Sequence, residues 1–355
     1  GGGGGGGGGE GGGEGPKATM RATMPSRFPT DVSSLAKFIV SPDCRSIAIL
    51  TGAVSVAAGI PDFRSPGGMF DTLQPELITA TAAQRRAMAA DPTAVVLKDM
   101  FFANAFPYLE VRRPFILGTR ERRWRATLSH RFAELLHAKT GKLTRLYTQN
   151  IDGLDYQTAL PTEKIVAVHG SIGKVACEGC GAPMEFDAFC AEVRARIKDL
   201  YGVDSTAPAE STPIPCPACH RPLVKPTTVL FGLSLPAEFF ERSAEDLPLV
   251  DLLLVAGTSL VVSPANSLVY RVPDSAARAV INAEPIGQEL GIRYSPGGRD
   301  LFLGGECDDT FLALMVQLGW ADDLARLDAE LPAASRKRLR TFLAAGEGDD
   351  HFTTV

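Results

Sequence analysis

The stretch SIAILTGAVSVAAG at residues 46–59 decides the fold. Its first part is a short, largely apolar run, and small residues and glycines follow. Such a run is typical of a strand buried on both faces, as in a parallel sheet. Small residues after the strand let the backbone approach a pyrophosphate closely, with the start of a helix behind it. The stretch therefore predicts the first strand and a phosphate-binding loop of an α/β domain.

Similar runs recur along the chain, and helical patterns lie between some of them. Leu128, Phe132 and Leu135 are spaced to form one apolar face of a helix, and Gly141 is placed to end it. Strands that alternate with helices predict an α/β fold with a doubly wound parallel sheet. The further predicted strands are LTRLY (143–147), KIVAV (164–168), TTVL (227–230), VDLLLV (250–255), AVI (279–281) and LFL (301–303).

Small and polar residues follow most of these strands directly. In open α/β sheets, ligands bind outside the carboxyl ends of the strands. The pattern therefore predicts one extended polar ligand that lies across this edge of the sheet. The segments are TGA (51–53), TQNID (148–152), HGS (169–171), AGTS (256–259), NAE (282–284) and GGECD (304–308).

Composition excludes several classes of protein. Of the 355 residues, 45% are hydrophobic and 22% are charged, which excludes a largely disordered or coiled-coil chain. The net charge of -5 excludes a globally basic nucleic-acid binder. The arginine-rich segment 112–125 is expected to be a solvated surface, so no direct nucleic-acid partner is predicted. No apolar run reaches the roughly 20 residues that a membrane helix requires.

The chain divides into a tail, a large domain and a C-terminal helix. Residues 16–30 are basic and lack acids, as in a transit peptide, although a floppy tail is favoured. The predicted parts are a disordered glycine-rich and basic tail (1–30), a globular domain (31–320) and a C-terminal helix with a polar tail (321–355). Within the domain, the sheet-forming parts are 31–65, 128–170 and 225–320, with a helical insert at 66–127 and a cysteine-bearing module at 171–224.

Two C-x-x-C pairs predict a metal site. Cys177 with Cys180, and Cys216 with Cys219, each place two thiolates within reach of one ion. Two such pairs close a tetrahedral Zn²⁺ site without an open position, so the predicted zinc is structural. The 35 residues between the pairs exceed the usual spacing, and we expect the intervening loop to bulge out. Chance or redox-active pairs are the alternative.

His169 is the best-placed titratable residue. It follows the predicted strand KIVAV directly and precedes Gly170. At the carboxyl edge of the sheet, near Gln149 and Asn150, a histidine suits the role of general base. In isolation, a structural histidine is slightly favoured over a catalytic one.

Taken together, these segments resemble the sirtuin family of NAD-dependent protein deacylases. The resemblance covers residues 31–320 and is closest to the class of cytosolic and nuclear deacetylases. It implies a Rossmann-like domain with a smaller zinc-binding and helical module. The segments that carry it are TGAVSVAAGIPDFRS (51–65), YTQNID (147–152), VHGS (168–171), the two C-x-x-C pairs, KPTTVLFG (225–232), GTSL (257–260), INAE (281–284) and GECDD (305–309).

The resemblance also implies roles for individual residues. His169 is the expected general base, and Asn150 is the expected second catalytic residue. Val229, Phe231 and Gly232 are expected to pair with the backbone of an acyl-lysine peptide. The expected NAD contacts are Gly52, Ala53, Ser55, Ile60, Asp62, Phe63, Arg64, Gln149, Asn150, Ile151, Asp152, Gly257, Thr258, Ser259, Asn282, Glu284, Cys307 and Asp308.

The implied reaction consumes NAD as an electrophile. The acyl oxygen of acetyl-lysine attacks the ribose as nicotinamide leaves, and His169 deprotonates a ribose hydroxyl. The products are lysine, nicotinamide and O-acetyl-ADP-ribose. The expected partners are proteins that carry acetylated or long-chain acylated lysine, with histones and tubulin as candidates. A cytoplasmic or nuclear location is expected ahead of a mitochondrial one.

Two departures from the family pattern stand out. The family reads G-A-G-x-S in the phosphate loop, whereas Gly52-Ala53-Val54-Ser55 is one residue shorter and lacks the second glycine. We expect the loss of one backbone N–H at the phosphate and weaker NAD binding. The family often has Glu after Phe-Gly, where this chain has Leu233.

The same residues are compatible with other functions. Mono-ADP-ribosyl transfer and plain NAD cleavage break the same first bond. The shortened loop also suits a zinc-bearing protein that binds acylated lysine without turnover, although His169 and Asn150 argue against this. A hydride-transferring dehydrogenase is disfavoured because no predicted strand is followed by its G-x-G-x-x-G fingerprint.

Overall fold

The computed structural model describes residues 1, 27–60 and 68–346. Its strands are β1 (Ile47–Thr51), β2 (Leu143–Thr148), β3 (Ile165–Ala167), β4 (Val175–Cys177), β5 (Pro183–Met184), β6 (Val224–Pro226), β7 (Leu252–Ala256), β8 (Ala277–Asn282) and β9 (Asp300–Gly304). Its α-helices are α1 (Val32–Val40), α2 (Ala82–Ala90), α3 (Lys98–Ala103), α4 (Phe106–Arg120), α5 (Leu128–Thr140), α6 (Phe186–Arg196), α7 (Ala237–Asp246), α8 (Leu268–Arg271), α9 (Cys307–Gln317), α10 (Ala321–Leu327) and α11 (Ala333–Gly346).

The main sheet has six parallel strands in the order β3-β2-β1-β7-β8-β9. The chain runs outward from β1 in one direction and from β7 in the other, which is the doubly wound Rossmann order. The predicted α/β fold with a parallel sheet is therefore confirmed. In this topology the strand order reverses between β1 and β7, and ligands bind at that point.

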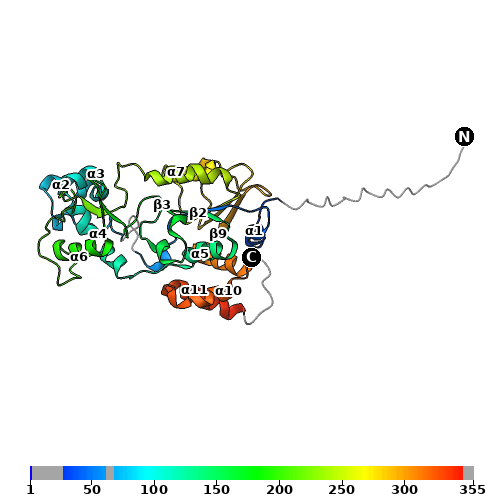
Figure 1. The fold of residues 1–355 in the computed structure, drawn as a ribbon. Helices are drawn as coiled ribbons and strands as arrows, with labels where there is room; N and C mark the ends of the chain where they lie inside the picture. Colours follow the sequence, from blue (N-terminus) through cyan, green and yellow to red (C-terminus); the bar gives the residue numbers. More distant parts are fainter. Residues whose placement is uncertain (2–26, 61–67, 347–355) are drawn as a thin grey trace.

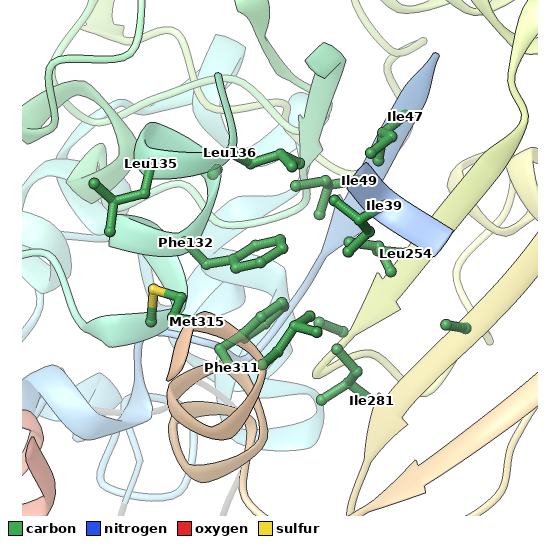
Figure 2. Close-up of a cluster of buried hydrophobic side chains, with 14 of the residues drawn as sticks. Ile39, Ile47, Ile49, Phe132, Leu135, Leu136, Leu254, Ile281, Phe311 and Met315 are labelled. Carbon is green, nitrogen blue, oxygen red and sulfur yellow. The ribbon is translucent and has the colours of Figure 1, made fainter. Parts of the chain in front are cut away.

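Helices cover both faces of this sheet. Successive side chains of a strand point to opposite faces, so Ile47 and Ile49 of β1 face α1, α5 and α9, while Ala48 and Leu50 face α7 and α8. Figure 2 shows the first of these layers, in which the ring of Phe132 lies close to that of Phe311. These layers leave the carboxyl edge of the strands as the place where loops from different strands meet.

α5 forms where its sequence predicts a helix and ends at the predicted residue. Its predicted apolar face is buried, and Gly141 follows with φ of +67° as its left-handed cap. Within the described ranges, no helix has the length and apolar character that crossing a membrane requires.

A smaller module lies beside the main sheet. It contains the antiparallel sheet β5-β4-β6 together with α2, α3, α4 and α6, which gather at one end of the molecule (Figure 1). It has a hydrophobic core of its own, to which Phe101, Ile116 and Phe189 belong. The predicted smaller module with helices and cysteines is confirmed.

Three expectations need correction. TTVL (227–230) is not a strand, because its backbone bonds to His169 and Lys174 instead of to a neighbouring strand. The arginine-rich segment is only partly solvated, since Arg113 is 3% exposed and bonds Asp204 at 2.6 Å.

The loop between the cysteine pairs also differs from the expectation, because it does not simply bulge out. Asp204 and Ser211 anchor it to α4, where Ser211 Oγ donates to the fully buried carboxylate of Glu110 at 2.6 Å. The helical insert and the cysteine module therefore form one packed unit.

Candidate active site

The loops after β1 and β7 touch at the switch point of the sheet. Gly52 N–H donates to Ala256 O at 2.9 Å, and Ala53 N–H donates to Gly257 O. A Cβ on Gly52 would lie 2.6 Å from Gly257 O and 2.9 Å from Thr258 Cβ, so only glycine fits there. This close approach explains why small residues follow both strands.

Polar side chains from neighbouring strands meet beside these glycines. Gln149 Nε2, after β2, donates to Thr258 Oγ1 at 3.0 Å, and Asn150 Nδ2 donates to Ser55 Oγ at 3.0 Å. Asn282 Nδ2, at the end of β8, donates to Thr258 O at 3.3 Å. The structure therefore brings together predicted site residues from the ends of four strands.

The phosphate loop uses its first backbone N–H groups internally. Those of Gly52 and Ala53 bond to the β7 loop, and that of Val54 donates to Gly52 O at 2.7 Å. The next N–H groups, from Ser55 to Ala57, lead into the short 3₁₀ helix η1 (Val56–Ala58) and have no partner among the described residues. These groups, together with the glycine contact at the switch point, fit a dinucleotide that approaches the backbone closely.

His169 lies on the same edge, two residues after β3 ends. Its Nδ1 is 3.1 Å from Gln149 O. A carbonyl oxygen only accepts hydrogen bonds, so Nδ1 carries the proton and Nε2 is the basic nitrogen. Gln149 thereby fixes the tautomer and the orientation of the ring, an arrangement that suits a general base.

A second histidine, His130, lies behind the site and was not selected from the sequence. It is 2% exposed, and its Nδ1 accepts the backbone N–H of Thr127 at 3.1 Å. Its Nε2 faces Ser55 Oγ at 3.4 Å. Burial lowers the pKa of His130 and keeps it neutral. The only sequence signal is its place three residues after the cap Thr127.

Asp152 is buried next to this histidine, and Asp155 is buried near Asp152. Burial raises the pKa of Asp152, although its carboxylate accepts the backbone N–H of Leu154 at 2.9 Å. Burial also raises the pKa of Asp155 to about 6. The Ser55 hydroxyl thus lies among Asn150, His130 and Asp152, in a polar network beneath the phosphate loop.

The other predicted NAD residues are placed less uniformly. Asp62, Phe63 and Arg64 lie outside the described residues. Ile60 and Ile151 pack against the core of the smaller module. Ser259 and Glu284 are exposed after β7 and β8, and Cys307 Sγ is 3.7 Å from Ile281 O, with burial raising its pKa to about 11.

Asp308 has protein partners for both carboxylate oxygens. One accepts from Ser129 N at 3.0 Å and from Ser129 Oγ at 2.7 Å, and the other accepts from Ser335 Oγ at 2.5 Å. Ser335 belongs to α11, which also packs against η1. Asp308 therefore attaches the C-terminal helix beside the phosphate loop, and its contact with adenine stays a prediction.

The segment predicted to pair with a peptide is already partly paired. Val229 N–H donates to His169 O at 2.9 Å, and Phe231 N–H donates to Val96 O at 2.9 Å. Phe231 O in turn accepts from Lys98 N–H at 3.0 Å. Of the three predicted residues, Gly232 alone keeps both backbone groups without a partner among the described residues. Gly232 and the carbonyl of Val229 are therefore the backbone groups left for a peptide, and the peptide contact itself stays a prediction.

The four cysteines of the two pairs form one cluster. Their sulfurs all lie within 4.8 Å of one another, with Cys177 to Cys219 at 3.7 Å and Cys180 to Cys216 at 3.6 Å. A tetrahedral Zn²⁺ with Zn–S of about 2.3 Å spaces its sulfurs by roughly 3.8 Å. The backbone N–H of Arg221 lowers the pKa of Cys219 to about 6, whereas burial raises the pKa of Cys177, so the spacing of the sulfurs is what supports a zinc site. The four cysteine sulfurs therefore fit the predicted zinc site.

The Rossmann-like sheet, the polar edge at its switch point and the cysteine cluster define a nucleotide-binding α/β protein with a structural zinc module. The Sir2 family model matches residues 52–264, and the chain belongs to the Sir2 family.

Curated relatives agree with this assignment. The chain is 34% identical over 312 residues to "NAD-dependent protein deacetylase sirtuin-2" of Danio rerio, which covers 83% of this chain and 74% of the relative. It is 33% identical over 298 residues to "NAD-dependent protein deacetylase hst2" of Schizosaccharomyces pombe, with 83% and 79% covered. It is 33% identical over 299 residues to "NAD-dependent protein deacetylase sirtuin-3" of Mus musculus, with 83% and 78% covered.

Proposed function

We propose that this protein is an NAD-dependent protein-lysine deacetylase. The observation that carries the proposal is the contact of Gln149 O with His169 Nδ1, which places a histidine with a basic Nε2 at the polar edge of the sheet. NAD would supply the ribose, whose carbon is attacked by the acyl oxygen as nicotinamide leaves and whose hydroxyl then receives the acetyl group from lysine. Curated relatives that cover most of the chain bear the name of this activity.

Each residue of the site has a proposed role that follows from its position. Gly52 and Gly257 allow the dinucleotide to approach the switch point. Asn150 and Ser55 hold the ribose side of the site through their mutual hydrogen bond. His169 takes a proton at Nε2, because Gln149 O keeps the other ring nitrogen protonated. Asp62, Phe63 and Arg64 are proposed to complete the nicotinamide side.

The substrate, compartment and domain limits are part of the same proposal. The substrates are proteins with acetylated or long-chain acylated lysine, with histones and tubulin as candidates. The seven cysteines, none of them in a disulfide, favour a reducing compartment such as the cytoplasm or nucleus. The catalytic domain spans residues 31–320, and α11 is an addition that packs on it.

One assay tests the reaction. The protein is incubated with NAD and an acetyl-lysine peptide, and mass spectrometry follows nicotinamide, O-acetyl-ADP-ribose and modified protein. Deacetylated peptide and O-acetyl-ADP-ribose in equal amounts support the proposal. Nicotinamide with free or protein-bound ADP-ribose, and no deacetylation, would replace it with NAD cleavage or ADP-ribosyl transfer.

A further inference from the structure

Lys225, in β6, is a fully buried lysine that the proposed reaction does not use. Its exposure is 0%, and burying an ammonium group is costly unless its protons are all accepted. Lys225 Nζ donates to Pro226 O at 2.7 Å and to Thr228 O at 2.6 Å, and it pairs with Glu178 Oε1 at 2.7 Å. Three acceptors thus match the three N–H donors of the ammonium.

The acceptors belong to two different parts of the proposed machinery. Glu178 follows the zinc ligand Cys177 in the first cysteine pair, where its N–H donates to Leu223 O at 2.9 Å. Pro226 and Thr228 begin the segment that leads to Gly232. The ammonium of Lys225 is therefore a direct link between the cysteine cluster and the peptide-binding segment.

The opposite side of this segment touches the loop of His169. A Cβ on Gly170 would collide with the carbonyl of Thr227, and Thr227 Oγ1 donates to Ser171 O at 3.2 Å. Val229 N–H donates to His169 O at 2.9 Å. Residues 226–229 are thus held between Lys225 on one side and the loop of the proposed base on the other.

Aromatic side chains of the helical module complete the surroundings of Lys225. Its Nζ lies 5.5 Å from the ring centre of Tyr108 and 5.9 Å from that of Phe101. Tyr108 Oη lies 2.5 Å from Thr228 Oγ1. An ammonium is attracted to both rings and to the carbonyls, whereas an apolar side chain would leave the carbonyls buried without a donor.

We propose that Lys225 is a positioning residue for the acyl-lysine peptide, acting through the carbonyls of Pro226 and Thr228 and braced by Glu178. This inference rests on the proposed deacetylase function. It predicts a selective effect, because the contacts of Lys225 with the described residues lie away from the switch point where NAD is proposed to bind. A purely structural lysine would instead lower stability without separating the two substrates.

The test is Lys225→Met in the full chain, with KM measured for the acetyl-lysine peptide and for NAD. The peptide KM should rise roughly tenfold or more, because two buried carbonyls lose their donor. The NAD KM should stay within about twofold and the zinc content should not change. Lys174→Met is the matched control, because Lys174 is exposed and its ammonium group contacts the ring of Tyr156. The substitution leaves the backbone carbonyl of residue 174 in place, and that carbonyl still accepts the N–H of Thr227.

Two further measurements keep the inference open to refutation. If Lys225→Met does not fold, Glu178→Ala can be used, because it removes one acceptor of the Lys225 ammonium at a half-buried position. A peptide KM of Glu178→Ala equal to that of the wild type would overturn the proposal. Fluorescence anisotropy of a labelled acetyl-lysine peptide tests binding without turnover. If the wild type binds the peptide but does not deacetylate it, the proposed deacetylase function is refuted. If Lys225→Met binds the peptide as tightly as the wild type does, the positioning role of Lys225 is refuted. If the wild type neither binds nor deacetylates the peptide, both the proposed function and the role of Lys225 are refuted.

Discussion

Asn150 donates a hydrogen bond of 3.0 Å from Nδ2 to Oγ of Ser55, joining the loop after β2 to the shortened loop after β1. The amide therefore reaches the site from the strand that also supplies Gln149, the partner of His169. The adjacent residues Gln149 and Asn150 thus connect the proposed base to the phosphate loop. A change in the loop can consequently affect both NAD binding and the orientation of Asn150.

His169→Ala should abolish deacetylation. A general base contributes about 100-fold to 10,000-fold to the rate, and kcat should fall by that factor while zinc content and the unfolding temperature stay unchanged. His137→Ala is the control, because His137 lies in the last turn of α5, away from the sheet edge. Near-normal turnover by His169→Ala would remove the assignment.

Strand positions were predictable from sequence where both faces are buried. Six of the seven predicted runs form the main sheet, because nearly continuous apolarity has few other uses in a chain of this composition. TTVL (227–230) has the same composition but is held by Lys225 and by the loop of His169. The apolar pattern of a segment alone does not predict such contacts with a side chain and a loop.

The site was predictable where residues follow strands directly, and less so elsewhere. Gln149, Asn150 and His169 meet because parallel strands end at one edge of the sheet. His130 reaches Ser55 from α5, a contact that depends on how the helix packs across β1. The link from Glu178 to Lys225 joins the residue after β4 to a residue of β6, and neither sequence segment specifies it.

Removing one thiolate should release the metal and destabilise the smaller module. Purified wild type should contain one zinc per chain by elemental analysis, and Cys216→Ser should lose zinc, unfold at lower temperature and lose activity. Cys190→Ala is the control, because burial raises the pKa of this thiol to about 11 and it lies outside the cluster. Active wild type without zinc would contradict the site.

Restoring the length of the phosphate loop should tighten NAD binding. The N–H groups of Ala53 and Val54 are engaged within the protein, so an inserted glycine between them can offer a new donor to phosphate. A charge-assisted hydrogen bond is worth about 1.5–3 kcal/mol, which corresponds to roughly tenfold to a hundredfold in Kd. Calorimetry compares this variant with a glycine inserted beside Gly297. Equal NAD affinity would show that the short loop already provides the contact.

His130 should make stability fall in mild acid. Burial lowers the pKa of His130 in the folded protein, so the unfolded chain binds the proton more readily. The stability that its neutral form provides is present above about pH 6.5, the ordinary histidine pKa, and is lost as the pH falls below it. Urea unfolding at about pH 7.5 and pH 5.5 should show a larger loss for wild type than for His130→Asn. An equal loss in both would mean that His130 is not buried in its neutral form.

We predict that residues 68–76 line the acyl-binding part of the site, so acyl specificity should follow their apolar character. This stretch contributes Met69, Phe70 and Leu73, which pack against the core of the smaller module, and it contains neither Tyr nor Arg. A succinyl carboxylate buried there would have no cationic partner, which is costly. Acetyl and longer fatty acyl groups should be accepted, because each buried methylene contributes about 0.8 kcal/mol. The measurement compares kcat/KM for acetyl-, myristoyl- and succinyl-lysine in one peptide. If succinyl-lysine were the best substrate, a cation from elsewhere in the chain would have to line the pocket, and the assignment of its walls would be wrong.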